Sequence, residues 1–277
     1  MQTHIRIPGP PLSQYVDLIW YSKAGVYNSR GTLIPMLQPE LVFNFSAHFS
    51  VQTASCRTIE NKLSWLTGLQ TQPMQSATAG WHQTIGVLLK PWALCVFTGI
   101  PACEFTGTMV EGDLVWPQEV PSLYATLAEA TTIPHKLNRF EEFLLSKCHV
   151  KPLPVYVRAG TQFLQKNTLR EGITAELASQ LNMSRKTLIA AFRQYIGLSP
   201  GRFQHLCLVN HILQELKTDP SQSLTELAYR YNFYDQAHFI HSFKKISGLT
   251  PSGYRHLVQQ GLVADDSPNY WQAAGSG

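Results

Sequence analysis

The chain has 277 residues, of which 44% are hydrophobic and 11% aromatic, and it carries a formal net charge of +4 at pH 7. This length favours two domains, and the apolar content is enough for sizeable cores. No apolar run approaches the roughly 18–20 residues of a membrane span, and the N-terminus lacks the pattern of a secretory signal peptide, so we expect a cytoplasmic protein with no membrane-embedded part.

The cysteines are odd in number and scattered along the chain: Cys56, Cys95, Cys103, Cys148 and Cys207. A disulfide framework would have an even number of clustered cysteines, so this pattern favours a reducing compartment. No two cysteines have the spacing of a structural zinc site, and we expect neither a metal nor another cofactor.

Basic residues are concentrated in the second half of the chain. Residues 1–154 hold 10 Lys and Arg against 10 Asp and Glu, whereas residues 155–257 hold 12 against 6. The remaining residues, 258–277, hold two acidic residues and no basic one. A neutral half joined to a basic half indicates that only the second half meets a polyanion.

The first part of the chain is rich in short strand patterns. Runs such as Leu41–Phe45 and Ile85–Leu89 combine β-branched, aromatic and other apolar side chains, and clusters of Pro and Gly separate them. Several such runs at short spacing predict a small barrel or sandwich.

Residues 122–147 have a helical period instead. The recurring apolar positions are Leu123, Leu127, Leu137, Phe140 and Leu144. Pro134 is expected to divide the segment into two helices. Two interpretations stay open, because these helices could pack on the barrel or one of them could pair with its copy in a dimer. The two prolines in 149–154 (HVKPLP) cannot continue a helix, so this stretch reads as a stiff linker.

The basic half repeats itself at an interval of about fifty residues. Residues 173–203 align with residues 224–254: Leu177-Ala178 with Leu227-Ala228, Phe192 with Phe243, Gly197 with Gly248, Pro200 with Pro251, and Phe203 with Tyr254. The second copy has one extra residue near Tyr234. This regularity predicts a duplicated unit of helices.

Each copy contains the start and stop signals of two helices. Ser184 and Asp235 are good N-caps for the second helix of each copy, and Gly197 and Gly248 are the expected left-handed stops. A Pro that follows Ser or Thr then starts the next helix. Two helices with a tight turn and a small residue at their crossing form a helix-turn-helix. A connecting helix at about 204–217 is expected to hold the two units together.

These motifs resemble the DNA-binding domain of the AraC/XylS transcription regulators. The resemblance covers residues 155–257 and is carried by ELASQLNMSRKTLIAAF and FKKISGLTPSGYR. Less specifically, the N-terminal part resembles the β-barrel sensor and helical dimerisation region that many members have upstream. The resemblance implies as partners double-stranded DNA, RNA polymerase, an unknown small-molecule effector and a second copy of the chain in a homodimer through residues 121–148.

The expected fold is therefore α+β. An N-terminal β-rich, cupin-like barrel at 1–120 serves as the effector-sensing domain, with a helical dimerisation or packing region at 121–148. A linker at 149–154 leads to an all-α domain of two helix-turn-helix units at 155–257, and 258–277 form a flexible tail.

The resemblance also implies which residues meet DNA. The expected base-reading residues are Lys186, Ile189 and Ala190 in the first recognition helix, and Gln236, Ala237, Ile240 and His241 in the second. The expected phosphate contacts are Ser184, Arg193, Asp235, Lys244 and Lys245. Gln236 can bond adenine and His241 can donate to guanine, whereas the first helix offers only Lys186 as a long polar side chain. His238 and His241 lack a third ligand at suitable spacing, so we do not expect a metal there.

Aromatic residues and one histidine of the N-terminal half are the candidates for an effector pocket: Trp20, Phe43, Phe45, Trp81, His82 and Trp92. Each of them could equally belong to the ordinary core of a barrel, and the sequence does not decide between the two readings. Cys95 and Cys103 could sense redox state, although buried inert thiols are the simpler interpretation.

Three functions compete at this point. The first is a sequence-specific transcription regulator, dimeric and responsive to a ligand, which is not an enzyme. The second is a DNA-repair or DNA-modifying enzyme with the same DNA-binding module, which needs an activated cysteine. The one adjacent Cys–His pair is Cys148-His149, whose side chains project in different directions. The third is an architectural DNA-binding protein, which the β-rich domain argues against.

Overall fold

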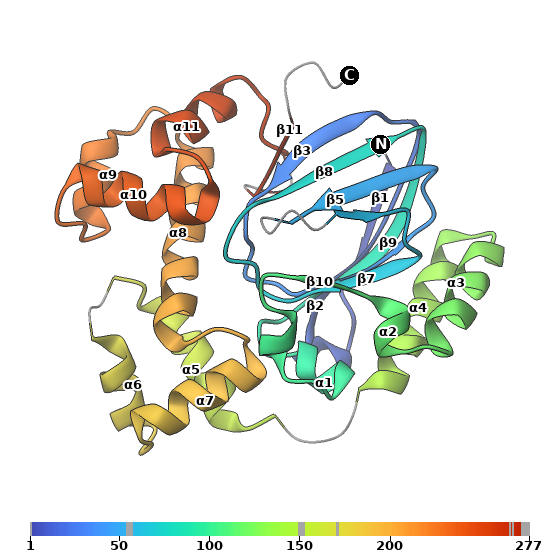
Figure 1. Ribbon diagram of the computed structural model, residues 1–277, viewed down its shortest axis with the longest axis horizontal. Coiled ribbons are helices and arrows are strands. Elements are labelled where there is room, and N and C mark those ends of the chain that lie inside the picture. Colours follow the sequence, from blue (N-terminus) through green and yellow to red (C-terminus); the bar gives the residue numbers. More distant parts are fainter. Residues whose placement is uncertain are drawn as a thin grey trace.

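The computed structural model describes residues 2–53, 58–148, 153–169, 172–265, 267 and 269–272. Figure 1 shows a β-rich N-terminal domain beside a group of helices from the C-terminal half. The expected α+β class is confirmed, with a β-rich, barrel-like N-terminal domain and an all-helical C-terminal domain that contains two helix-turn-helix units. No helix in the described part of the chain is long and apolar enough to cross a membrane.

Two antiparallel sheets form the N-terminal domain. The six-stranded sheet has the order β1 (Gln2–Arg6), β2 (Val16–Val26), β9 (Trp81–Leu89), β4 (Glu40–Asn44), β7 (Ser64–Thr67) and β10 (Met109–Glu111). The five-stranded sheet has the order β11 (Tyr270–Gln272), β3 (Ser29–Leu33), β8 (Met74–Ala79), β5 (His48–Gln52) and β6 (Thr58–Glu60). The strands β4 and β9 contain the two apolar runs from which the sequence predicts a barrel.

Side chains alternate between the two faces of the six-stranded sheet, and each face has its own apolar cluster. On β4, Leu41 and Phe43 belong to the large cluster that the helices share. Val42, between them, belongs to a smaller cluster with Val51 and Trp65 on the inner face, between the sheets. The inner face therefore has fewer residues to fill it, which leaves room for a cavity.

Short helices cover the outer face of the six-stranded sheet (Figure 1). In chain order, with η1 and η2 as 3-10 turns, they are η1 (Leu12–Gln14), α1 (Leu94–Thr98), η2 (Ala102–Phe105), α2 (Gly112–Val115), α3 (Glu119–Glu129) and α4 (Ile133–Lys147). Pro134 lies in the first turn of α4, as expected, and Thr132 caps that helix. Phe43 contacts the rings of Phe140 and Phe143 edge to face, at 5.6 and 6.3 Å. Of the two interpretations of this segment, packing on the barrel is the one observed, and the dimer stays a prediction.

The C-terminal domain consists of α5 (Val155–Lys166), α6 (Ile173–Gln180), α7 (Arg185–Tyr195), α8 (Pro200–Thr218), α9 (Leu224–Arg230), α10 (Gln236–Ser247) and α11 (Pro251–Gln259). The predicted repeat is confirmed, because α6 and α7 correspond to α9 and α10. Asn182 and Asn232 both have a positive φ, 51° and 55°, in the turn between the two helices. The expected linker at 149–154 lies largely outside the described residues, since 149–152 are not among them.

The expectation of a flexible tail at 258–277 is wrong for the residues that form β11. This strand pairs antiparallel with β3, so the chain returns from the last helix to the edge of the sensor sheet. The Tyr270 ring lies over Gly31, where a Cβ atom would come within 2.5 Å of it. The Tyr270 and Ser29 hydroxyls are 2.9 Å apart. Because Gly31 has no side chain, the Tyr270 ring can lie directly over it, and β11 can pack against the edge of the sheet.

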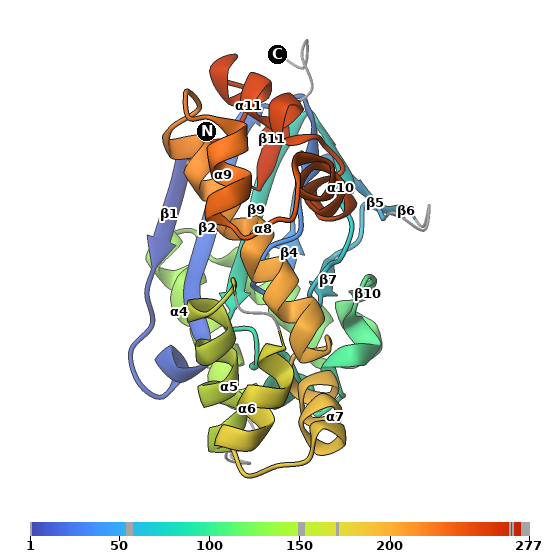
Figure 2. The ribbon, with the colours of Figure 1, turned by 90° about the vertical axis from the view of Figure 1, so that its left-hand side faces the viewer.

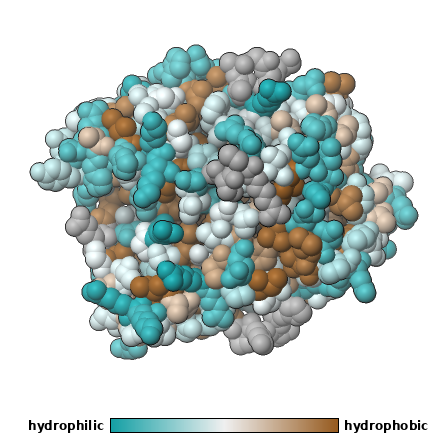
Figure 3. Space-filling view, viewed as in Figure 1, coloured by the Kyte–Doolittle hydropathy of each residue, from teal (hydrophilic) through white to brown (hydrophobic). Residues whose placement is uncertain are grey.

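The face of the molecule in Figure 3 is largely hydrophilic, and hydrophobic side chains gather mainly toward the lower right of that view. The helix-turn-helix units lie at the left, away from this region (Figure 1).

Candidate DNA-binding interface and sensor cavity

The two recognition helices, α7 and α10, begin with side-chain caps. The Ser184 hydroxyl accepts a hydrogen bond from the Thr187 backbone N–H at 3.1 Å, and the Asp235 carboxylate accepts one from the His238 N–H at 2.7 Å. Both predicted N-caps are confirmed. The Asp235 carboxylate can only accept, so a phosphate near the start of α10 would be met by the free backbone N–H groups, whereas the Ser184 hydroxyl can still donate its own proton.

The residues expected to read bases lie on the surface of the recognition helices. Lys186, Ala190, Gln236, Ala237 and His241 are exposed, while Ile189 and Ile240 are half-buried. The opposite face of each helix is fully buried through Leu188 and Phe192 in α7 and through Phe239 and Phe243 in α10. Burial therefore fixes which face of each helix is available to a partner.

The available faces are basic. Neither α7 nor α10 contains an acidic residue, and Arg193, Lys244 and Lys245 lie exposed in their last turns. Cations at these positions also interact favourably with the helix dipole. The three side chains thus give the end of each recognition helix an exposed positive charge.

Helix α8 holds the two units in one arrangement. Figure 2 shows α7 and α10 near opposite ends of α8 and on the same side of it. The Glu215 carboxylate on α8 accepts hydrogen bonds from Tyr231 at 2.6 Å and from Arg230 at 2.7 Å, which fixes the end of α9. His205 on α8 is 2.5 Å from the Ser242 hydroxyl on α10.

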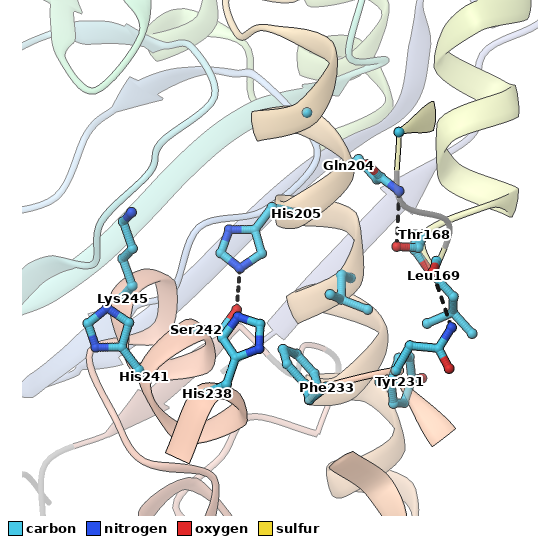
Figure 4. A pocket seen from close by; sticks show the side chains of 14 residues that line it. Thr168, Leu169, Gln204, His205, Tyr231, Phe233, His238, His241, Ser242 and Lys245 are labelled. Carbon is cyan, nitrogen blue, oxygen red and sulfur yellow. Dashed lines mark hydrogen bonds between the residues drawn. The ribbon is translucent and has the colours of Figure 1, made fainter. Parts of the chain in front are cut away.

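A groove of about 460 Å³ lies beside α10. Figure 4 shows His205, His238 and His241 around it. Burial lowers the pKa of His205, and the nearby Lys245 and His238 lower it further, so this ring is neutral at pH 7. His205 therefore acts as a hydrogen-bond partner of Ser242 in positioning α10. Among the described residues, no three His, Cys, Asp or Glu side chains are grouped in a way that could hold a metal ion.

A second cavity, of about 650 Å³, lies between the two sheets of the sensor domain. Its wall is mainly apolar, with Val42, Phe49 and Trp65 among the lining residues. The connecting helix α8 closes one side of it through Asn210, His211 and Gln214. The tail also contributes to the wall, through Ser267, Asn269 and Tyr270. The cavity is thus bounded by both halves of the chain.

Only two of the six effector-pocket candidates line this cavity, Trp20 and His82. The other four are elsewhere. Phe43 points outward to α4, and Phe45 stacks on Tyr124 of α3 at 4.5 Å. The Trp81 side chain is 48% exposed, and the Trp92 indole donates to the Gln14 carbonyl at 3.2 Å. Strand alternation explains the error for Phe43, because its neighbour Val42 is the residue that faces inward.

Sequence reasoning missed the acidic residue of the cavity, Glu40. It lies on β4 two residues before Val42, so both side chains face the space between the sheets. Burial raises the Glu40 pKa to about 7, and a hydrogen bond from the Trp20 side chain partly opposes this effect. Burial lowers the pKa of His82 and of His211. The signal available in the sequence was the alternation in ELVFN, which puts Glu40 and Val42 on one face.

The two halves of the chain also meet away from the cavity. The Thr106 hydroxyl donates to the Gly197 carbonyl at the end of α7, at 3.0 Å. At the end of α10, a Cβ atom on Gly248 would come within 2.9 Å of Pro73. Both recognition helices therefore end against the sensor domain.

Of the cysteines in the described part of the chain, Cys103 is exposed, contrary to the expectation of a buried thiol, and the other three are poor nucleophiles. Burial raises the pKa of Cys95 to about 11 and that of Cys207 to about 12, and it also raises the Cys148 pKa. A raised pKa disfavours the thiolate, which is the reactive form. His149, the sequence neighbour of Cys148, lies outside the described residues.

Two families match separate parts of the chain. Residues 177–256 match the helix-turn-helix domain family, and residues 4–111 match a domain of unknown function, DUF6597. The first match covers the region in which the sequence predicts two helix-turn-helix units. The second covers most of the sensor sheets.

Curated relatives are similar over part of their length. An uncharacterized HTH-type transcriptional regulator of Haemophilus influenzae is 37% identical over 83 residues, which are 30% of this chain and 28% of the relative. The MmsAB operon regulatory protein of Pseudomonas aeruginosa is 28% identical over 141 residues, which are 46% of this chain and 45% of the relative. The matched part thus spans less than half of the length of each.

A solved structure has a similar fold over most of the chain. ToxT from Vibrio cholerae O395, determined bound to (E)-4-(8-methylnaphthalen-1-yl)but-3-enoic acid, superimposes with a TM-score of 0.50. The alignment covers 86% of this chain and 99% of that one, at 10% sequence identity. At this identity the similarity concerns the fold.

Proposed function

We propose that the chain is a sequence-specific DNA-binding regulator of transcription, because its C-terminal half resembles the tandem helix-turn-helix domain of the AraC/XylS regulators and residues 177–256 match a helix-turn-helix family. The observation that carries the proposal is the pair of basic, acid-free recognition helices held on one side of α8 (Figure 2). Two such helices meet successive major grooves when they are about one helical turn of DNA apart, ~34 Å.

Base reading is assigned to the exposed residues of the two helices. Gln236 and His241 supply the polar groups in the second unit, and Lys186 supplies the one in the first. Arg193, Lys244 and Lys245 contact phosphates, which adds affinity without sequence preference. The regulator acts together with RNA polymerase, as members of the family do, and the outer surface of α3 and α4 is the proposed place of a homodimer contact.

A small molecule in the sensor cavity controls the regulator. The cavity is large enough for an organic molecule, and α8, which connects the two reading units, forms part of its wall. The similarly folded ToxT was solved with an organic molecule bound, which supports the view that this fold can hold a ligand. A ligand in contact with α8 is placed to alter the arrangement of α7 and α10.

Selection of duplexes from a random pool by the full-length protein tests DNA recognition. We expect a recovered motif with two half-sites about one helical turn apart, ~10 base pairs. Fluorescence anisotropy on that duplex and on a scrambled duplex then gives both affinities. A pool that yields no motif, or equal affinity for both duplexes, would contradict sequence-specific reading.

Lys244→Ala is a companion test of the phosphate contacts. The variant is expected to weaken binding to both duplexes and to make the slope of log K against log salt shallower by about one unit. Glu60→Gln, on the far edge strand β6, is the control and should leave both slopes unchanged. An unchanged slope for Lys244→Ala would remove this residue from the phosphate contacts.

A further inference from the structure

The sensor cavity has an unbalanced set of charged side chains in its wall. Among the described residues that line it, Glu40 is the one carboxylate, and none is Lys or Arg. Glu40 forms no ion pair with a described residue, and its partner is the Trp20 side chain. An ionised carboxylate in an apolar cavity is costly unless a cation or several hydrogen bonds compensate it.

The fold around Glu40 is shaped to keep this carboxylate inside the cavity. Glu40 is opposite Leu88 on β9 and Thr67 on β7, so strands flank it on both sides. Trp20 reaches it from β2, and its indole lies across Gly86, where a Cβ atom would be 2.5 Å from the ring. The glycine therefore permits the approach of the hydrogen-bond donor.

We propose that the sensor cavity binds an apolar organic cation, of the primary-amine class, whose ammonium group pairs with the Glu40 carboxylate. This inference rests on the proposed function, since it names the ligand class of the same cavity. The ammonium supplies the positive charge that the protein wall lacks, and its remaining N–H groups can donate to Thr67 and other polar side chains of the lining.

The other titratable groups of the lining leave Glu40 as the source of charge. They are His82 on β9, His211 on α8, Tyr27 and Tyr270. Burial lowers the pKa of both histidines, so their rings are neutral at pH 7 and above. An organic acid would meet no Lys or Arg among the described lining residues, and its carboxylate would lie near the carboxylate of Glu40. The cavity therefore discriminates against anions.

The rest of the wall indicates what the cation carries. Phe49 and Trp65 stack in parallel with ring centroids 4.7 Å apart, and both line the cavity. Val42, Met109 and Leu88 extend this apolar surface toward Glu40. A flat aromatic or an alkyl body attached to the ammonium group matches a surface of this kind, because burial of that body supplies affinity without further polar contacts.

Matched probes separate the charge of a ligand from its shape. Tryptamine, tryptophol and indolepropionic acid share an indole and differ in the terminal group, and octylamine, octanol and octanoic acid do the same for an alkyl chain. Their affinities for the full-length protein are measured by isothermal titration calorimetry at pH 8. We expect each amine to bind about 10- to 100-fold more tightly than its alcohol, as for a charge-assisted hydrogen bond, and more tightly still than its acid.

Variants at position 40 test the pairing. Glu40→Gln keeps the shape and removes the charge, so the preference for amine over alcohol should disappear. Glu40→Asp keeps the charge on a shorter side chain and should retain the preference at lower affinity. Glu60→Gln, outside the cavity, is the matched control and should bind as the unmodified protein does. Circular dichroism of each variant verifies that it is folded.

The pH dependence gives an independent readout. Glu40 has a pKa of about 7, so the affinity for tryptamine should rise as the pH is raised from 6 to 8. It should do so about tenfold per unit below the pKa and then level off. In Glu40→Gln the affinity should not depend on pH over this range. A histidine that binds the ligand would give a different dependence of affinity on pH. The variants His82→Gln and His211→Gln show whether either histidine is responsible.

Three outcomes would overturn the proposal: an acid that binds as tightly as its amine, an amine preference that survives Glu40→Gln, or no binding by either amine. None of these bears on DNA recognition, which the duplex selection measures without a ligand. Failure of the selected duplex to bind would instead contradict the proposed function while the amine result stands.

Discussion

At the scale of single residues, the ionisation of Glu40 links the sensor cavity to stability. Burial raises its pKa from 4.5 to about 7, so the folded protein holds this proton more tightly than the unfolded chain does. Stability from the bound proton is fully present below about pH 4.5 and is lost as the pH rises through about 7. The ionised side chain is thus a destabilising element at pH 8 in the absence of a ligand.

Glu40→Gln should therefore stabilise the ligand-free protein at pH 8. We expect an increase in the free energy of unfolding of roughly 1–3 kcal/mol at pH 8, which declines toward zero near pH 5. Urea unfolding at both pH values, followed by tryptophan fluorescence, measures the difference. Glu60→Gln lies on the surface and should change stability little at either pH. Equal stabilisation at both pH values would show that removal of charge is not the cause.

Gln236 tests base reading in the second recognition helix. Its side chain is exposed at the first residue of α10, and an amide can bond adenine through both its N–H and its carbonyl groups. Gln236→Ala should reduce discrimination at one base pair of the selected site by about 1–3 kcal/mol. Competition with single-base variants of the duplex measures this, and Gln259→Ala at the end of α11 serves as the control. An equal loss of affinity for every duplex would assign Gln236 to general binding.

The sequence reveals some of these residues and conceals others for a physical reason. The caps Ser184 and Asp235 are visible because a cap is a local signal, within three residues of the N–H group it satisfies. Glu40 is not visible, because its burial depends on strands that are far apart in the chain and on Trp20 reaching across Gly86. Phe43 is misplaced for a related reason, since apolar character does not indicate which face of a sheet a residue occupies, and Trp92 lies in the turn after β9 rather than on a strand.

At the scale of secondary structure elements, β11 is the strand that the local sequence pattern does not predict. A strand of three residues is too short to show the alternation of apolar and polar side chains that indicates a strand. The segment around it therefore looks like a tail in the sequence. Its position is fixed instead by the free edge of β3 and by the space above Gly31. In contrast, α7 and α10 have caps, stops and a buried face in their own sequence, and both were predicted at nearly the observed bounds.

Tyr270 is expected to stabilise this strand and the sensor sheet. Tyr270→Ala removes the ring that covers Gly31 and one part of the cavity wall, and should lower the free energy of unfolding by about 2–4 kcal/mol. Tyr270→Phe removes only the contact with Ser29 and should cost about 0.5–1.5 kcal/mol. Thermal unfolding and amide exchange of β3 report the two effects. If Tyr270→Ala leaves β3 fully protected, the strand does not depend on its neighbour β11.

At the scale of the whole molecule, α8 belongs to both functions. Its apolar face forms the common core of the two helix-turn-helix units, through residues such as Leu206, Val209 and Leu213. Its other face lines the sensor cavity. The Asn210 side chain donates to the Pro35 carbonyl at 3.1 Å and accepts from Asn269 at 2.9 Å, so α8, the sensor and the tail meet at one residue. A ligand that shifts α8 would reposition both recognition helices together.

Asn210→Ala should therefore weaken the coupling between ligand and DNA. The factor by which tryptamine changes the Kd for the selected duplex must equal the factor by which the duplex changes the Kd for tryptamine, because binding free energies are linked. Couplings of this kind are typically about 5- to 150-fold, and Asn210→Ala should bring both factors toward one by equal amounts. Titrations of each ligand with and without the other measure them, with Thr218→Ala at the end of α8 as the control. A coupling that is unchanged in Asn210→Ala would mean that it passes through the contacts at Gly197 and Gly248 instead.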